Sequence, residues 1–374
     1  MKSDRSAALA LMAAAIAGLI LANSSFGPAL LDFKQLYLGP ESLGLKLSIE
    51  HWVSDLLLAV FFLVAGLELK HELRIGVLSK PATAMVPIVA AVGGVIVPAL
   101  IYLAFNAGTD AIRGWPIPTA TDIAFALGVL AIFGRGLPRQ ARIFLLALAI
   151  FDDLVAILII AVFFTSDLEP SWLLAAVAVA VVHSFLEKVK RLPINLIRVL
   201  SFLLLWYFVL QSGVHPTIAG VALGLIIPAR KAHWLIGKIQ PWSNTLVLPL
   251  FAFFAVAIAL PSFEGSSSNV FLGIAIALPV GKILGITLFA VLANSIASAD
   301  SKLELKIPDF LAVAALAGVG FTVSLLMAKL AFEDSPEIAA EATMAVLFGS
   351  VVSMLLGSAL AQARGRHYSR IEGQ

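Results

Sequence analysis

Residues 143–164 read Ile-Phe-Leu-Leu-Ala-Leu-Ala-Ile-Phe-Asp-Asp-Leu-Val-Ala-Ile-Leu-Ile-Ile-Ala-Val-Phe-Phe. A straight helix needs about 20 predominantly apolar residues to cross a bilayer, so this stretch predicts a membrane-spanning helix. In its middle stand two adjacent acids, Asp152 and Asp153, and each carboxylate at that depth costs about 3 kcal/mol to insert. Neighbours on a helix point about 100° apart, so one acid can bind an ion while the other serves a different partner. The stretch therefore predicts a functional site inside the membrane.

A set of fixed salt bridges is the structural alternative for these two acids. The basic residues nearest to them in sequence are Arg139 and Arg142, which lie at the start of the helix rather than in mid-span. That position weakens the salt-bridge interpretation without removing it.

The composition of the whole chain agrees with a membrane protein. Hydrophobic residues make up 60% of the 374 positions and charged residues 13%, whereas soluble domains contain about 45–50% apolar and about 25% charged residues. The net charge of +2 and the lack of a basic face argue against a nucleic-acid partner. The absence of cysteine excludes disulfides, thiolate metal sites and cysteine nucleophiles, and we expect no cofactor.

Twelve apolar segments follow one another along the chain, with no connection long enough for a soluble domain. We therefore predict an all-α polytopic membrane protein with about twelve transmembrane helices in a single domain, residues 1–374. Several segments are shorter than a straight span, which predicts broken or tilted helices. The first could be a cleaved signal peptide, but an uncleaved span fits the continuing pattern better. The segments are 6–22, 51–73, 85–105, 115–133, 143–164, 172–185, 194–210, 214–227, 246–260, 270–292, 310–332 and 339–361.

The basic residues predict the orientation of these segments. With the N-terminus in the cytoplasm, twenty Lys and Arg residues fall in inside connections and tails, and only four fall outside: Lys34, Lys46, Arg113 and Lys329. Positively charged residues concentrate in cytoplasmic loops, so both termini are predicted to be cytoplasmic.

Residues 116–125, Pro-Ile-Pro-Thr-Ala-Thr-Asp-Ile-Ala-Phe, interrupt the fourth segment. Two prolines and two threonines break regular helix and leave backbone groups free, which a membrane tolerates only inside protein or beside a watery cavity. We expect Thr121 to cap a half-helix that starts at Ile123, with Asp122 beside its positive end. A capping turn at the membrane surface is the alternative.

Two further features lie in the second half of the chain. Residues 317–322, Ala-Gly-Val-Gly-Phe-Thr, form a similar interruption in the eleventh segment, although small residues also serve plain helix packing. Lys282 is the one basic residue deep in a span. A nearby carboxylate would keep it charged, and snorkelling of the side chain to the surface is the alternative.

The second segment carries several polar residues. Glu68 and Glu72 are four residues apart and share a helix face. With Asp55 they could form an acidic funnel at the cytoplasmic mouth, and a solvated helix end is the alternative. His215, in Ser-Gly-Val-His-Pro-Thr at 212–217, is interpreted as a structural histidine rather than a proton relay.

The stretches Thr-Ala-Thr-Asp-Ile-Ala-Phe-Ala-Leu-Gly at 119–128 and Phe-Asp-Asp-Leu at 151–154 closely resemble the NhaA sodium/proton antiporter family. The order and spacing of the other similar stretches make the resemblance specific, and it covers nearly the whole chain. These stretches are 60–62, 66–68, 212–215, 248–252, 281–282 and 318–322.

The resemblance implies twelve helices with inverted repeats, at about 85–164 and 270–361. The fourth and eleventh helices would be interrupted and would cross in mid-membrane, and such paired interruptions mark transporter sites, a rule drawn partly from this family. The resemblance also implies a β-hairpin at about 32–48, used in a homodimer. The Gly-Pro pair at 39–40, between alternating stretches, is consistent with that hairpin.

The resemblance also assigns roles to the charges inside the membrane. Asp153, with its neighbour Asp152, would carry ion binding and proton exchange. Asp122 and Lys282 would balance the charges of the half-helix ends, and Lys282 would also pair with Asp152. Thr121 and unwound backbone carbonyls could complete a sodium shell.

Two departures from the family pattern put its usual pH regulation in doubt. Many members carry acidic and histidine residues before Pro-Trp at the start of the ninth helix, whereas residues 237–242 read Gly-Lys-Ile-Gln-Pro-Trp. Members also commonly have Ala-Asn-Ala-Gly where residues 254–257 read Phe-Ala-Val-Ala. Neither departure touches the predicted ion site.

The predicted function is therefore secondary active, electrogenic exchange of Na⁺, and also Li⁺, for H⁺ by alternating access. It would take place in the bacterial inner membrane, in pH homeostasis, and the protein would not be an enzyme. Two adjacent carboxylates and a lysine titrate as a coupled set, so protons and sodium would compete for one site. The alternatives are a transporter of another solute and an intramembrane aspartyl protease. The protease pattern Gly-x-Gly-Asp is absent, because Phe321 follows Gly320.

Overall fold

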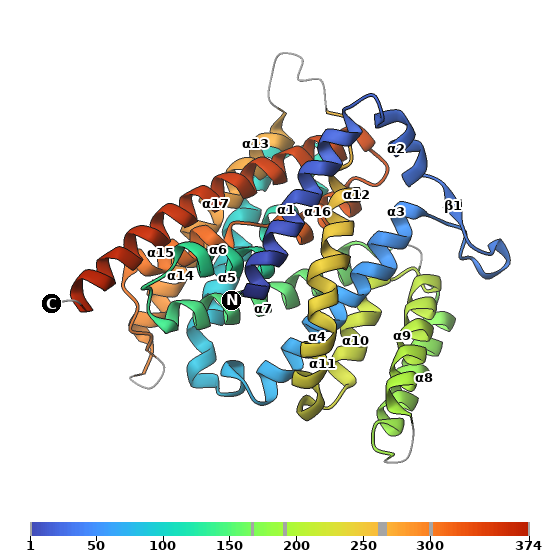
Figure 1. Cartoon of the computed structure of the whole chain (residues 1–374), viewed down its shortest axis with the longest axis horizontal. Helices are drawn as coiled ribbons and strands as arrows, with labels where there is room; N and C mark the ends of the chain where they lie inside the picture. The colour runs from blue at the N-terminus through green and yellow to red at the C-terminus, as the bar shows by residue number, and fades with distance from the viewer. Residues whose placement is uncertain (1, 166–167, 190–192, 261–267, 299–301, 373–374) are drawn as a thin grey trace. The chain divides into compact units, whose positions relative to one another are not determined.

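The structure, a computed structural model, describes residues 2–165, 168–189, 193–260, 268–298 and 302–372. Apart from one small two-stranded sheet, these residues form helices and the turns between them (Figure 1). The elements divide between two compact units, and α1 (Lys2–Ala22) and α7 (Arg139–Phe163) are shared by both.

Each predicted apolar segment has a helical counterpart. Seven helices are long and apolar enough to cross a membrane, and three bent helix pairs pass the same test when each pair is taken as one span. Two shorter apolar helices, Pro170–Leu186 and Thr217–Ile226, correspond to the two remaining segments. The prediction of an all-α polytopic membrane protein is confirmed.

Unit 1 comprises Met1–Met12, Val77–Ala156 and Ile258–Gln374. Besides parts of α1 and α7 it contains a series of helices and short helical turns. They are η3 (Val77–Ser79), α5 (Pro81–Asn106), η4 (Asp110–Gly114), η5 (Ile117–Thr119), α6 (Ile123–Phe133), α13 (Asn269–Ile276), η7 (Ala277–Gly281), α14 (Lys282–Ile296), α15 (Ile307–Ala317), α16 (Phe321–Ala331) and α17 (Pro336–Glu372).

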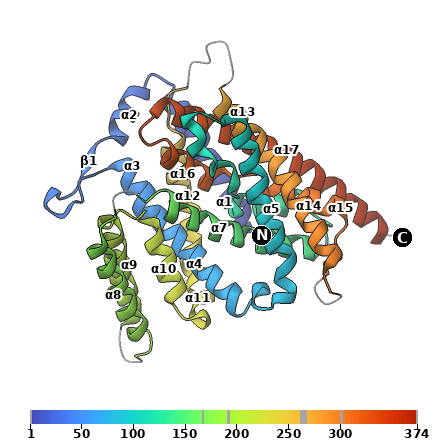
Figure 2. The same cartoon turned by 180° about the vertical axis from the view of Figure 1, so that it is seen from behind.

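Close helix packing in unit 1 depends on small residues. Helices α5 and α14 lie side by side (Figure 2), and Gly93 and Gly285 stand at their contact, where a side chain on either would overlap the other's carbonyl oxygen. In a membrane, where lipid is as apolar as the helices, such close backbone approach is a main source of association. Helix α17 runs along α13 and α15 and also packs against α6 and α16 (Figure 1).

Unit 2 comprises Ala13–Gly76 and Ile157–Ala257. Its N-terminal elements are α2 (Gly27–Lys34), β1 (Tyr37–Leu38), η1 (Glu41–Leu43), β2 (Leu47–Ser48), α3 (Ile49–His51), the π-helical turn η2 (Trp52–Leu57) and α4 (Leu58–Arg74). The remainder are α8 (Pro170–Leu186), α9 (Ile194–Gln211), α10 (Thr217–Ile226), α11 (Ala229–Trp242), the π-helical turn η6 (Ser243–Val247) and α12 (Leu248–Val256).

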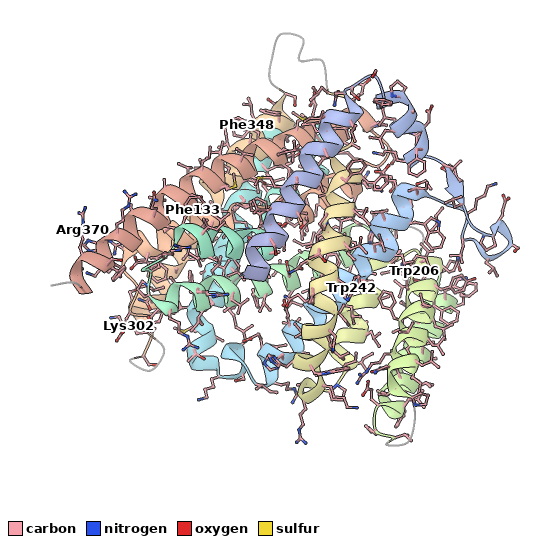
Figure 3. The ribbon with its side chains drawn as sticks, in the orientation of Figure 1. Phe133, Trp206, Trp242, Lys302, Phe348 and Arg370 are labelled. Atoms are coloured by element: carbon pink, nitrogen blue, oxygen red, sulfur yellow. The ribbon has the colours of Figure 1, made fainter. Side chains whose placement is uncertain are left out.

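Helix α4 is the centre of unit 2 and packs on α10 and α11. At Gly66 and Gly220 an added methyl group would meet the backbone of the facing helix, which allows α4 and α10 to approach closely. Trp206 of α9, labelled in Figure 3, donates its indole N–H to the carbonyl oxygen of Asp55 at 3.1 Å. It is almost fully buried, so α9 is fixed on the α3–α4 segment by both packing and a hydrogen bond.

The connection after α1 contains a helix and a short hairpin. Helix α2 makes a bend of 113° with α1. Strands β1 and β2 then pair antiparallel, with Tyr37 opposite Ser48 and Leu38 opposite Leu47. Strand pairing therefore begins at Tyr37, because residues as far as Lys34 belong to α2.

Candidate functional site

Two interrupted helices of unit 1 meet at their breaks. Turn η5 and α6 are bent by 43° at residues 120–122, and α15 and α16 by 50° at residues 318–320. The backbone N–H of Asp122 donates to the carbonyl oxygen of Val319 at 2.7 Å, so the two unwound segments are in direct contact. Prolines precede the first break and interrupt its helix. At the second break Gly318 allows close packing, because a side chain there would meet Leu278 and Ser353.

The carboxylate of Asp122 joins the starts of two half-helices. Its Oδ1 accepts from the backbone N–H of Phe125 in α6 at 2.9 Å. Its Oδ2 accepts from the backbone N–H and the hydroxyl of Thr322 in α16, at 3.3 and 2.7 Å. Asp122 is therefore the N-cap of α6, and the prediction that Thr121 caps this helix is wrong. A carboxylate at two positive helix ends is favourable because each end carries unpaired N–H groups.

Lys282 supplies the positive charge of this group of residues. Its ammonium group is fully buried and donates to the carbonyl oxygen of Thr119 at 2.5 Å, to Thr121 Oγ1 at 3.0 Å and to Asp152 Oδ2 at 2.5 Å. The three N–H bonds of a protonated lysine thus each have an acceptor. The side chain does not snorkel to the surface.

Thr121 connects the lysine and the acid to the second break. Its hydroxyl lies 2.7 Å from Asp152 Oδ2 and 2.7 Å from the carbonyl oxygen of Ala317, the last residue of α15. A hydroxyl has one proton and cannot give it fully to both oxygens at once. The position of that proton is therefore sensitive to the charge on Asp152.

Asp152 has one carboxylate oxygen in use and one that is not. Oδ2 takes the hydrogen bonds from Thr121 and Lys282. Among the residues that the structure describes, none provides a hydrogen-bond partner for the buried Oδ1. Asp153, the next residue of α7, is also buried. A negatively charged oxygen without a donor attracts a proton or a metal cation.

The site thus contains three carboxylates and one ammonium group, all buried. Asp122 faces N–H groups at helix starts, and Lys282 faces a carbonyl at the end of η5 (Ile117–Thr119). The described residues contain no cluster of three His, Cys, Asp or Glu side chains that could hold a resident metal ion.

The two acids predicted to share a funnel are far apart. Asp55 and Glu68 stand thirteen positions apart on the helical run Ile49–Arg74, which corresponds to about 20 Å at 1.5 Å per residue. One mouth therefore cannot contain both. Glu68 accepts a hydrogen bond from Gln240 at 2.7 Å, which ties α4 to the end of α11.

His215 is held locally. Its Nδ1 lies 2.7 Å from the hydroxyl of Thr217, and its Nε2 lies 4.0 Å from Asp55 Oδ1. Asp55 also accepts a hydrogen bond from Ser54 at 2.9 Å. The histidine therefore stands in a small polar group of unit 2 and makes the contacts expected of a structural residue.

Unit 2 contains a buried ionic cluster of its own, which centres on Glu187, the residue that follows α8. Arg198 Nε lies 2.6 Å from Glu187 Oε1, Arg198 Nη2 lies 3.1 Å from Oε2, and Lys231 Nζ lies 2.8 Å from Oε2. Burial alone would raise the pKa of Glu187, but the hydrogen bonds from the two cations outweigh it and the pKa lies below its ordinary value. The cluster joins α8, α9 and α11.

Sequence reasoning missed the partners that lie far away along the chain. The carbonyl groups of Thr119 and Ala317 contribute backbone oxygens, which carry no residue-specific signal. The acids Asp309 and Glu187 are buried with basic partners, but both stand at the ends of apolar segments, where acids are usually solvated. The only sign of these pairs in the sequence was that charged residues stand at the ends of two apolar segments, and such ends could lie next to each other.

Comparison with known proteins places the chain among transporters. The profile of the family described as Na+/H+ antiporter 1 matches residues 1–360. Na(+)/H(+) antiporter NhaA 2 of Clavibacter michiganensis is 47% identical, covering 99% of this chain and 92% of that protein. Na(+)/H(+) antiporter NhaA of Thermobifida fusca is 41% identical, with 99% and 94% covered. Na(+)/H(+) antiporter NhaA 2 of Pseudomonas syringae is 44% identical, with 95% and 92% covered.

Proposed function

Because the chain belongs to the Na+/H+ antiporter 1 family, we propose that it exchanges sodium ions, and lithium ions, for protons across the bacterial inner membrane. The observation that carries the proposal concerns Asp152, beside Asp153 and at the contact of two interrupted helices: within the described part of the chain its Oδ1 has no hydrogen-bond partner. A buried charge costs several kcal/mol unless it is compensated. An oxygen left open at that cost fits an ion-binding role.

In the proposed ion site, Asp152 and Asp153 bind the cation. Sodium is a hard cation and prefers oxygen ligands, which carboxylates, hydroxyls and backbone carbonyls provide. Thr121 supplies the hydroxyl, which can turn between Asp152 and the carbonyl of Ala317. A proton taken up by either carboxylate removes the charge that attracts sodium. Protons and sodium therefore compete for the same oxygens.

Lys282 compensates the negative charge of the carboxylates when the site holds protons or contains no sodium ion. Its ion pair with Asp152 occupies one carboxylate oxygen of an acid that we propose as a sodium ligand. Sodium binding to Asp152 weakens this pair, because one carboxylate charge is then shared between two cations. The lysine and the two acids form one coupled titrating set, and exchange of more than one proton per sodium ion would make transport electrogenic.

We further propose that the site works by alternating access, and the paired breaks support this. We propose that the regions 85–164 and 270–361 are inverted repeats. The similar bends at η5–α6 and α15–α16 support this assignment, as does the pairing of α5 with α14. If the site opens to one side at a time, competition between protons and sodium is sufficient to couple their gradients.

The proposed orientation puts both termini in the cytoplasm, on the basis of the distribution of Lys and Arg between connections. We further propose a homodimer that uses the hairpin of β1 and β2. Its exposed apolar side chains, including Tyr37 and Leu38, are consistent with a protein contact. Glu68 remains a candidate for the cytoplasmic mouth without Asp55.

Reconstitution in sealed proteoliposomes tests the proposal. Sodium added outside should move protons in the opposite direction, and the apparent pH midpoint should fall as sodium is increased, because the two ions compete. The control is the Asp152→Asn variant at equal protein density. Proton movement that ignores sodium, or that follows another solute, would contradict the proposal. A steep pH midpoint that does not respond to sodium would contradict simple competition.

A further inference from the structure

The last turns of α17 contact the distal ends of both interrupted helices of unit 1. One contact is made with the start of α15 through Asp309, and the other with the loop that follows α6. In Figure 3, Phe133 at the end of α6, Lys302 before α15 and Arg370 near the end of α17 lie toward the same end of this unit. Both half-helices therefore reach α17 at the ends that lie away from their breaks.

The contact with α15 is a buried ionic cluster. Arg364 Nε lies 2.8 Å from Asp309 Oδ1, and the hydroxyl of Tyr368 donates to Oδ2 at 2.7 Å. The guanidinium also lies over the ring of Tyr368, 5.1 Å from its centre. Asp309 is fully buried and accepts from the backbone N–H of Lys306 at 2.9 Å, which caps α15. A charge buried to this degree holds its partner firmly, since separation leaves it uncompensated.

The contact with the loop after α6 is steric. Gly365 faces the backbone of this loop, and a methyl group on it would overlap the carbonyl oxygen of Arg135. Gly136 has a φ of +90°, which glycine adopts without strain, and a side chain there would meet Gly365 and Ser369. The loop and α17 are thus in backbone contact with no room for a side chain between them.

These two contacts are connected to the ion site through rigid helix. Asp309 is eight residues before Ala317, about 12 Å along α15, and Phe133 is ten residues after Ile123, about 15 Å along α6. Ala317 accepts a hydrogen bond from Thr121, and Asp122 caps α6. A shift at either distal end is therefore transmitted to residues that surround Asp152.

We propose that residues 364–369 of α17 form a clasp that sets the relative position of α6 and α15 and thereby the geometry of the ion site. Arg364 and Gly365 are its positioning residues. The proposal rests on the antiport function proposed above. Within the described residues, Arg364 Nη2 is buried without a hydrogen-bond partner, so this arrangement leaves one donor available for a second acceptor when the half-helices move.

The test compares Arg364→Gln and Gly365→Ala with two matched controls in the full-length chain. Arg366→Gln removes the same charge from an exposed position two residues away. Gly237→Ala adds the same methyl group in a helix where it meets nothing within 4 Å. Apparent KM for sodium and the pH profile are measured in proteoliposomes, well below the unfolding temperature of each variant. The rise in unfolding temperature caused by sodium is measured in detergent.

We expect both clasp variants to raise the apparent KM for sodium by roughly tenfold, because a 1 Å misplacement can cost about a hundredfold. They should also reduce the stabilisation by sodium, and both controls should match the unaltered protein. Arg364→Lys should recover part of the loss because it keeps the positive charge. If Arg364→Gln fails to fold, Tyr368→Phe removes only one hydroxyl and gives the milder measurement.

The outcomes separate this inference from the proposed function. Variants with a lower unfolding temperature but unchanged apparent KM, pH profile and sodium stabilisation would show a merely structural contact and overturn the clasp. An unaltered protein that moves no protons in response to sodium would instead refute the antiport proposal. Controls that are as impaired as the clasp variants would also overturn the inference, because the effect would then not be specific to these residues.

Discussion

Replacement of Asp122 by alanine tests whether one carboxylate supports two half-helices. The substitution removes the acceptors for the N–H of Phe125 and for the N–H and hydroxyl of Thr322. It leaves the starts of α6 and α16 uncapped inside the protein, where water cannot replace the lost bonds. Both helices should therefore lose stability from a single change.

The expected loss follows from the two caps. Removal of one N-cap side chain costs about 1–2 kcal/mol, so two caps correspond to about 2–4 kcal/mol. That is a change of roughly 30- to 700-fold in the unfolding equilibrium, at about 1.4 kcal/mol per tenfold. Asp122→Asn keeps one acceptor for Phe125 but turns an N–H₂ group toward the N–H of Thr322. It should cost about half as much, in part through the lost charge at two helix ends.

Unfolding in mixed micelles, followed by tryptophan fluorescence, measures these differences. Asp110→Ala is the control, because Asp110 is an exposed acid in the first turn of η4 and should change stability by less than about 0.5 kcal/mol. A loss for Asp122→Ala no larger than that of the control would refute the double-cap argument. An equal loss for alanine and asparagine would show that charge, rather than the two acceptors, dominates.

Three further results are expected. Asp152→Asn and Asp153→Asn should each abolish sodium-dependent proton movement while the protein still inserts, because each removes an insertion cost; near-normal transport in both would contradict the ion site. Lys282→Met should lower the free energy of unfolding by about 3–5 kcal/mol through a buried unpaired acid, and equal stability in micelles would contradict the pair. Glu187, whose pKa is depressed below its ordinary value of 4.5, should stabilise the protein above about pH 4.5. That stabilisation is lost as the pH falls through the folded pKa, so the stabilities of the unaltered protein and Glu187→Gln should converge in acid.

The membrane makes the spans of this chain readable from sequence. Apolar runs of helical length must cross or enter the bilayer, and a charge inside one is too costly to be accidental. For that reason Asp122, Asp152 and Lys282 could be singled out without a structure. Prolines and glycines likewise indicated both interruptions, because both residue types are unfavourable in the interior of a helix.

Contacts between distant segments could not be read in the same way. The dual role of Asp122 depends on Thr322, two hundred residues later, and no local pattern near Asp122 encodes that neighbour. The local sequence favoured Thr121 as the N-cap of α6, whereas its hydroxyl lies within hydrogen-bond distance of Asp152 and of the end of α15. Asp55 and Glu68 were predicted to share a funnel because both are acids on one segment, although their separation of thirteen positions along one helix was already readable from the sequence.

The buried acids differ in how many of their carboxylate oxygens accept hydrogen bonds. Both oxygens of Asp122, Asp309 and Glu187 have donors in the structure, so a proton or sodium ion at any of them must displace a bond already made. Asp152 differs, because Oδ2 is engaged and Oδ1 has no hydrogen-bond partner among the residues that the structure describes. At the proposed ion site a cation would bind without that cost, although the four acids are buried to a similar extent. Under the proposed function, the number of occupied carboxylate oxygens, rather than burial, separates Asp152 from these three acids.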